Sequence, residues 1–279
     1  MNLGIATLAA SSDIWFPDAT LYEGLPVLAA AGLTYLEYND QTLPKYKSLS
    51  QAEARDIRRR AEDFGLVLWS SHSFCAESDL STPDPVRRRE AVELHLRCVE
   101  RLGWLGVQNF VVHQIEGPAA TVAMRLPYGL ESVARLCEAG RDCGVRILIE
   151  NFVQFGCRQV RRLAEELGSD NLGIVFDVGH AHHTPRSEPD EIAICGDLLA
   201  SLHVHDNHGP ASGDEHLPPG YGTTDWPPVL DALAAVGYAG PFLMEVFPRT
   251  KGAAADAHAF VHESASAARA ILASRSTSR

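Results

Sequence analysis

Residues 146–180 read RILIENFVQFGCRQVRRLAEELGSDNLGIVFDVGH. Two short aliphatic runs, at 146–151 and 172–177, lie on either side of a helical stretch at 157–168. A strand, a helix and a second strand in that order form the repeating unit of a parallel α/β sheet. Both apolar runs end at a carboxylate, Glu150 in the first and Asp177 in the second. The stretch therefore predicts parallel strands with acidic side chains at their carboxyl ends.

The same pattern extends over the rest of the chain. Eight apolar runs read as strands, the first at residues 3–8, and helical stretches alternate with them. The helices are expected at 21–32, 50–65, 84–103, 130–144, 157–168, 188–197, 226–237 and 253–274. Seven runs end within a residue or two of a carboxylate or histidine: Glu37, His72, His113, Glu150, Asp177, the group His203, His205 and Asp206, and Glu245. Parallel strands with reactive groups at their carboxyl ends are typical of a (β/α)8 barrel.

We therefore expect the α/β class and a single (β/α)8 TIM barrel, with residues 1–279 as one domain. No Pro/Gly/Ser linker or run of charge divides the chain. The rival architecture, a doubly wound open sheet, would carry a glycine-rich dinucleotide turn after the first strand, and the sequence has none there.

Composition narrows the class of function. The chain has 36 acidic and 24 basic residues, a net charge of −12, which disfavours a general nucleic-acid surface. No apolar stretch approaches the roughly 18 residues of a membrane span, and the first residues lack the basic segment of a signal peptide. The six cysteines show no zinc-ribbon spacing, so we expect reduced, packed thiols. These features predict a cytoplasmic protein without membrane partners, with homo-oligomerisation left open.

The densest chemical signal lies in the last third of the chain. RILIEN places Glu150 after three aliphatic residues, where an ionised carboxylate is costly unless it is paired or binds a metal. FDVGH carries Asp177 and His180 three residues apart across a glycine, so both can turn into one site. In LHVHDN the side chains alternate, so His203 and His205 should point to the same side. This region therefore predicts a cluster of ionisable groups at one end of the barrel.

The strand PFLMEV adds a further carboxylate, Glu245. Together Glu150, Asp177, His203 and Glu245 make an oxygen-rich set of four ligands. Such a set suits a divalent metal, with Mn²⁺ as the first choice and Zn²⁺, Co²⁺ or Mg²⁺ as alternatives.

The chain resembles the xylose-isomerase-like barrel superfamily, which holds sugar and sugar-phosphate isomerases and epimerases, inosose-processing enzymes and the endonuclease IV group. The resemblance covers essentially the whole chain in strand order. Its most specific parts are IEN, FDVGH, HVHD, DEHLPPGYGTTDW and GYAGPFLMEV. It implies the same four metal ligands, and it prefers His203 over His205 because relatives carry the ligand three residues before an acidic residue, here Asp206.

The resemblance also implies an activity. In the epimerase branch the two metal-binding glutamates, here Glu150 and Glu245, act as acid and base. We therefore expect a divalent-metal-dependent isomerase or epimerase of a sugar, sugar phosphate or related polyhydroxy carbonyl compound, with proton transfer through a metal-stabilised enediolate. His180 resembles a residue that contacts a substrate oxygen in relatives. Further candidates for substrate contact are His72, His113, Glu37, Trp15 and His216.

Two other functions stay open. A dehydratase or lyase acting on an inosose or dehydroshikimate could use the same metal and base. Tagatose-epimerase-like enzymes carry an arginine six residues after the histidine ligand, where this chain has Gly209, so the substrate contact that this arginine makes in that subgroup is missing here. Asp214 and His216, with His72, His113 and His180, fall where endonuclease IV relatives add ligands for three zincs, so a zinc phosphodiesterase acting on abasic DNA is the third candidate. Sugar chemistry is preferred, because many small-molecule members retain a histidine before a Gly-x-Gly turn, as in HLPPGYG.

Several of these residues also have purely structural interpretations. His72 and His113 could serve only as hydrogen-bonding groups across the barrel mouth. Glu37 is expected behind the ligands or beside the substrate rather than as a ligand. The stretch 207–225 is long for a connection, which is typical of a functional or a mobile loop. His258 and His262 have zinc-like spacing, but we expect them on a helix surface.

Overall fold

The computed structural model describes residues 8–11, 21–39, 49–73, 79–115, 119–248 and 254–274. Its eight strands are β1 (Leu8–Ser11), β2 (Tyr35–Glu37), β3 (Val67–His72), β4 (Asn109–Val112), β5 (Arg146–Glu150), β6 (Leu172–Asp177), β7 (Leu199–His203) and β8 (Phe242–Met244). All pair in parallel in the order β7-β6-β5-β4-β3-β2-β1-β8.

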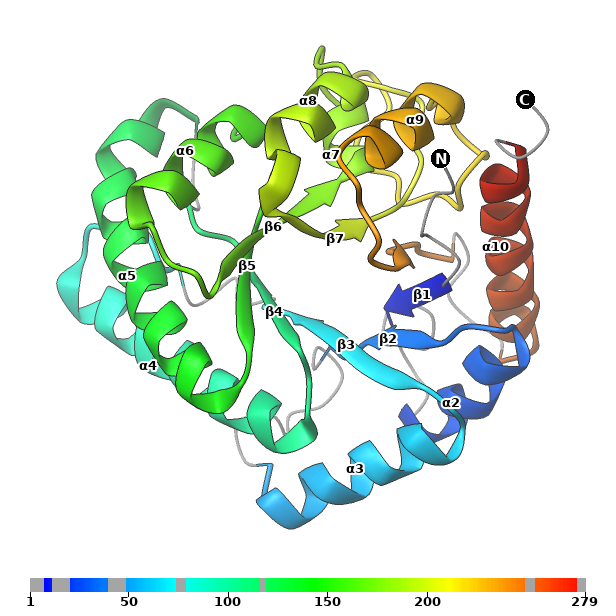
Figure 1. Cartoon of the computed structure of the whole chain (residues 1–279), viewed down its shortest axis with the longest axis horizontal. Coiled ribbons are helices and arrows are strands. Elements are labelled where there is room, and N and C mark those ends of the chain that lie inside the picture. Colours follow the sequence, from blue (N-terminus) through cyan, green and yellow to red (C-terminus); the bar gives the residue numbers. More distant parts are fainter. Residues whose placement is uncertain are drawn as a thin grey trace.

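Helices surround this sheet (Figure 1). They are α2 (Leu21–Ala30), α3 (Gln51–Asp63), α4 (Pro85–Leu105), α5 (Val122–Cys143), α6 (Cys157–Leu167), α7 (Val178–His182), α8 (Glu188–Cys195), α9 (Trp226–Ala235) and α10 (Ala254–Ser274). Two short 3₁₀ helices lie at Ala119–Thr121 and Gly196–Leu198. The arrangement confirms the predicted (β/α)8 TIM barrel.

The barrel closes just beyond the end of β7. Val204 forms a parallel bridge with Met244, in which its N–H donates to the Leu243 carbonyl at 2.8 Å. The N–H of Glu245 donates back to the Val204 carbonyl at 3.0 Å. Closure therefore involves Val204, which directly follows the predicted ligand His203, and the backbone of the predicted ligand Glu245.

The interior of the barrel explains why ionisable groups gather at one end. Val111, Leu148 and Val175, from three adjacent strands, pack together inside the barrel. Side chains two residues apart on a strand share a face. Two residues beyond Leu148 comes Glu150, and two residues beyond Val175 comes Asp177. The polar side chains of Glu150 and Asp177 therefore lie directly beyond the apolar side chains that fill the barrel.

Local signals set most helix boundaries as predicted. Ser50 and Glu53 form the expected capping box at the start of α3, with Glu53 Oε2 accepting from the Ser50 N–H at 2.9 Å. Pro85 lies in the first turn of α4. Gly32, beyond the end of α2, adopts φ +75°, a conformation that favours glycine.

Other boundaries were predicted wrongly. Helix α5 begins at Val122 rather than at residue 130 and continues through Pro127, which normally disfavours a helix interior. Strand β7 ends at His203, so Val204–Asp206 extend beyond it with only isolated bridges. The five-residue helix α7 directly after Asp177 was not predicted. Strand β1 begins at Leu8, the last residue of the predicted run, and residues 3–7 lie outside the described part.

Two further sequence expectations can be compared with the structure. The cysteines at 98, 137, 143, 157 and 195 are free thiols, and all except Cys143 are buried. Cys75 lies outside the described residues. In the part of the chain that the structure describes, no helix is both long and apolar enough to cross a membrane.

Candidate metal centre

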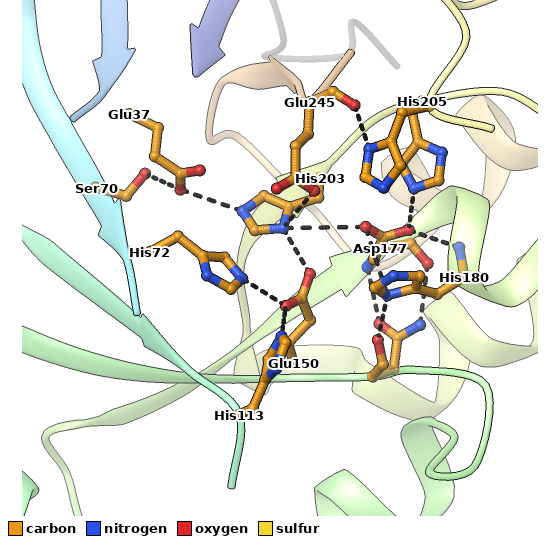
Figure 2. Close-up of polar contacts among 12 residues, drawn as sticks. Glu37, Ser70, His72, His113, Glu150, Asp177, His180, His203, His205 and Glu245 are labelled. Carbon is orange, nitrogen blue, oxygen red and sulfur yellow. Dashed lines mark hydrogen bonds and ion pairs between the residues drawn. The ribbon is translucent and has the colours of Figure 1, made fainter. Parts of the chain in front are cut away.

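The four predicted metal ligands lie together at the carboxyl end of the barrel (Figure 2). Glu150, Asp177, His203 and Glu245 can each offer one ligand atom within 4.8 Å of the other three. His203 Nδ1 lies 2.5 Å from Glu150 Oε1, 3.4 Å from Glu245 Oε2 and 4.0 Å from Asp177 Oδ2. All four residues are at most 2% exposed. The four strands β5 to β8 therefore bring their terminal polar groups to one point.

This donor set fits a divalent cation. Three buried carboxylates so close together are costly unless positive charge balances them. Asp177 Oδ2 is buried and makes no hydrogen bond to any described residue, although it faces His203 Nδ1. Three oxygen donors and one imidazole match the preferences of Mn²⁺, Mg²⁺ or Co²⁺.

Amide side chains hold the site residues in register. Gln114, which follows β4, donates to the Glu150 carbonyl at 3.0 Å and accepts from the Glu150 N–H at 3.3 Å. Asn151 makes the same paired contact with the backbone of Asp177, at 3.0 and 2.8 Å. Asn39 accepts from the His72 N–H at 2.7 Å. An amide from one strand end thus fixes the backbone of the site residue on the next strand.

In the metal-free site, protonated histidines balance the negative charge of the carboxylates. Burial alone would raise the pKa of Glu150, but His203, His72 and His113 outweigh it and hold that pKa well below its usual value. Burial opposes the charged form of His203, but Glu245, Glu150 and Glu37 outweigh it and raise the His203 pKa well above its usual value. Without a cation, His203 therefore keeps a proton where the cation would lie.

Two predicted mouth histidines contact the same carboxylate. His72 Nε2 lies 2.9 Å and His113 Nε2 lies 3.1 Å from Glu150 Oε2. The three residues form a second group with metal-ligand spacing, next to the first and sharing Glu150 with it. His72 is buried, whereas the His113 side chain is 27% exposed. His113 therefore lies at the side of the centre that is open to solvent.

A third group lies on the other side of Asp177. It consists of His180, His205, Asp214 and His216. The Nε2 atoms of the three histidines lie 3.4, 3.6 and 3.2 Å, in that order, from an oxygen of Asp214. His205 Nε2 is also 3.1 Å from Asp177 Oδ1. The third group therefore adjoins the four-ligand set through one carboxylate.

Hydrogen bonds fix the ring orientation of two of these histidines. His180 Nδ1 is 2.9 Å from the Asn151 carbonyl, and His216 Nδ1 is 2.9 Å from the Glu245 carbonyl. Because a carbonyl only accepts, Nδ1 carries the proton in both rings and Nε2 faces Asp214. His216 is the one non-glycine residue with positive φ, 48°, in the described part of the chain, a strained conformation often found at functional sites.

Burial opposes the charged form of His180 and of His216 in the metal-free protein. Asp177 and Asp214 nevertheless raise the pKa of His180 well above its usual value. Asp214 and Glu245 raise the pKa of His216 to about 9. The third group therefore also carries positive charge, on His180 and His216, near neutral pH.

Asp206 holds the loop that carries Asp214 and His216. Its carboxylate is fully buried and accepts from the Thr224 hydroxyl at 2.7 Å and the Gly220 N–H at 2.9 Å. The Trp226 indole donates to the same carboxylate at 3.3 Å. The loop 207–225 is thus anchored by hydrogen bonds to the end of β7.

The structure gives His205 a place in the site and adds two residues that the sequence analysis did not name, Phe152 and Phe247. His205, which the resemblance ranked below His203, belongs to the third group; its signal was the alternation of HVH. Gly179 makes room for it, since a Cβ there would lie 1.9 Å from the His205 ring. Phe152 and Phe247 flank the site, with ring centroids 5.0 Å from His113 and 4.0 Å from His216 respectively.

The remaining predicted residues take different places. Glu37 is fully buried against His203. Trp15 lies outside the described residues. His258 and His262 are exposed on α10, as expected of a surface helix face.

A family model of xylose isomerase-like TIM barrels matches residues 25–263. The chain belongs to this family. A protein of uncharacterised function from Sinorhizobium fredii is 25% identical over 262 residues, 83% of this chain and 82% of that protein. D-psicose 3-epimerase from Ruminiclostridium cellulolyticum is 25% identical over 255 residues, 85% of this chain and 81% of that enzyme.

A solved structure agrees on the fold. The structure of a D-psicose 3-epimerase in the presence of D-fructose has a TM-score of 0.82 to this chain at 18% identity, and the match covers 95% of this chain and 99% of that one.

Proposed function

We propose that this protein is a divalent-metal-dependent epimerase or isomerase of a sugar or related polyhydroxy carbonyl compound. The observation that carries the proposal is the buried set of Glu150, Asp177, His203 and Glu245, three carboxylates and one imidazole around one point. The similarity to ketose 3-epimerases over most of the chain supports the same chemistry.

When bound there, a divalent cation would polarise the substrate carbonyl and stabilise the negative charge that develops on its oxygen. Glu150 and Glu245 would then carry the proton between the substrate carbon and its new position. They extend from β5 and from the residue after β8, so they reach the centre from different sides. Removal of a proton by one and return by the other would invert the carbon centre, whereas return to the neighbouring carbon would give aldose–ketose isomerisation.

The two glutamates are held differently. Both oxygens of Glu150 are engaged, Oε1 by His203 and Oε2 by His72 and His113. Glu245 contacts His203 Nδ1 at the longer distance of 3.4 Å. Because the Glu245 carboxylate has fewer hydrogen-bond partners to give up, Glu245 is the better candidate to remove the substrate proton and Glu150 the better candidate to return it.

Specificity should differ from that of enzymes with an arginine at position 209. Gly209 has φ +85° and presents no side chain there. We place next to the substrate instead a row of rings that lie beside one another: His113, Phe152, His180, His216 and Phe247. Its three histidines contact Glu150, Asp177 and Glu245 of the four-ligand set, in that order. With aromatic rings here in place of the arginine side chain, a sugar derivative other than a free ketohexose suits the site better.

The test is solvent exchange into a panel of ketoses. The protein, loaded in turn with Mn²⁺, Co²⁺, Mg²⁺ and Zn²⁺, is incubated in D₂O with each ketose and the substrate is followed by NMR. Deuterium at the carbon next to the carbonyl, together with a new epimer or aldose, is the expected result. Loss of water from a keto-inositol would instead identify a dehydratase. A protein that gains no activity with any cation would contradict the proposal.

The arrangement of the site also favours a second candidate, a zinc phosphodiesterase that acts on abasic DNA. The described residues offer four overlapping groups of possible ligands rather than one, and the group around Asp214 contains three histidines, which suit Zn²⁺. Metal counting by mass spectrometry separates the two. One ion per chain with ketose exchange supports the epimerase, and three zincs with nicking of abasic duplex DNA support the phosphodiesterase.

A further inference from the structure

Glu37 is a buried carboxylate that belongs to none of the groups of possible metal ligands among the described residues. It ends β2, and its nearest site neighbour is His203, 166 residues later at the end of β7. His203 Nε2 lies 3.2 Å from Glu37 Oε2, and both side chains are fully buried (Figure 2). The two strands are not neighbours in the sheet, so the contact crosses the barrel.

The partners of Glu37 require it to act as an acceptor. The Ser70 hydroxyl donates to Glu37 Oε2 at 2.8 Å, and the Asn39 amide lies 3.4 Å from Oε1. An ionised carboxylate has no proton to donate. The nitrogen of His203 that faces Glu37 must therefore carry a hydrogen.

The other ring nitrogen faces the opposite way. His203 Nδ1 points to Glu150, Glu245 and Asp177, the three carboxylates of the ligand set. A neutral imidazole has one N–H and one lone pair, and a metal takes the lone pair. The two sides of the ring thus have different roles: Nε2 supplies the proton and Nδ1 the ligand.

We infer that Glu37 is a positioning residue that holds the proton on His203 Nε2 and so reserves Nδ1 for the cation. The inference rests on the metal site of the proposed function and adds the atom that binds and the residue that selects it. The charge of Glu37 also makes the imidazole a stronger donor, as carboxylates behind metal-binding histidines do. Glu37 is fully buried against His203, so the role inferred for it is exerted through that ring.

The first test measures binding of Mn²⁺ alone by isothermal titration calorimetry. Glu37→Ala should weaken binding by about 10- to 100-fold, the usual effect of removing such a partner. Glu37→Gln should lose less, about tenfold, because its carbonyl still accepts the N–H while its charge is gone. The matched control is Glu191→Gln, which removes another buried carboxylate, one that accepts from the Cys157 N–H at 2.6 Å and lies outside the site. The control should bind as the wild type does.

The second measurement needs no substitution. ¹¹³Cd bound to protein with ¹⁵N-labelled histidine should show one-bond coupling to Nδ1 of His203, while Nε2 keeps its proton. Coupling to Nε2, or wild-type Mn²⁺ affinity in Glu37→Ala, overturns the inference even if the centre binds metal. If the wild type binds no cation, the proposed metal site itself fails and the role of Glu37 fails with it. If Glu37→Ala does not fold, the coupling in the wild type decides.

Discussion

Replacing Glu150 by glutamine removes one negative charge from the centre of the site with almost no change in shape. The carboxylate accepts from ring nitrogens of His203, His72 and His113 at 2.5, 2.9 and 3.1 Å. Hydrogen bonds to charged groups are worth about 1.5–3 kcal/mol each, and an amide keeps part of them. A loss of a few kcal/mol fits within the roughly 5–15 kcal/mol by which domains are stable, so the barrel should still fold.

Turnover should respond far more strongly than stability. A positioned proton carrier contributes about 10²–10⁴-fold to a rate, or about 3–5 kcal/mol of barrier. We expect Glu150→Gln, and likewise Glu245→Gln, to lose at least 100-fold in deuterium exchange into the ketose that the wild type uses. The assay is run at saturating Mn²⁺, with bound metal counted, so that weaker binding is not mistaken for lost chemistry. Near-normal turnover in either folded, metal-loaded variant would remove that glutamate from the mechanism.

Four further outcomes are expected. His216→Ala should lower activity less than the glutamate changes do if the centre holds one metal. Complete loss of activity together with fewer metal ions bound per chain would indicate a metal cluster instead. Burial opposes the charged form of His216, but Asp214 and Glu245 raise its pKa to about 9, so its charge stabilises the metal-free fold fully below pH 6.5 and this contribution is lost as the pH rises through about 9. The increase in Tm on adding Mn²⁺ should therefore grow from pH 6.5 to pH 9. A constant increase would contradict that charge balance. Burial lowers the pKa of His95 to about 4, so its unfolded form binds protons first and on the order of 3 kcal/mol of stability should be lost between pH 6.5 and 4. Urea unfolding of His95→Gln should show a flatter acid limb. In Gly179→Ala the added Cβ would lie 1.9 Å from the His205 ring and should displace it. Titration calorimetry should then show a larger loss of Zn²⁺ affinity than of Mn²⁺ affinity. Equal losses would count against a zinc site at the third group that is separate from the four-ligand set.

The sequence alone predicted the barrel and its reactive end. Strand–helix alternation is encoded locally, and the period of two along a strand ties each terminal carboxylate to an interior residue two positions earlier. Glu150 above Leu148 and Asp177 above Val175 follow from this rule. The residue pattern and the family resemblance both selected the four residues that the fold brings within ligand distance.

The boundaries that were predicted wrongly show where local rules fail. Pro127 argues locally against a helix, yet α5 continues through it, and Leu126 and Leu130 on either side of it pack against the hydrophobic core. Helix α7 is too short to give a periodic signal, and the Asp177 side chain starts it by accepting the His180 N–H at 2.6 Å.

Only the closed barrel decided how the ionisable groups are paired. That His203 turns Nε2 toward Glu37 and Nδ1 toward Glu150 depends on strands that are far apart in sequence and meet only across the barrel. The same holds for His205, whose place beside Asp214 depends on the anchored loop 207–225. A sequence fixes which side chains reach the end of a strand, whereas the direction of each ring and carboxylate follows from contacts that exist only after closure.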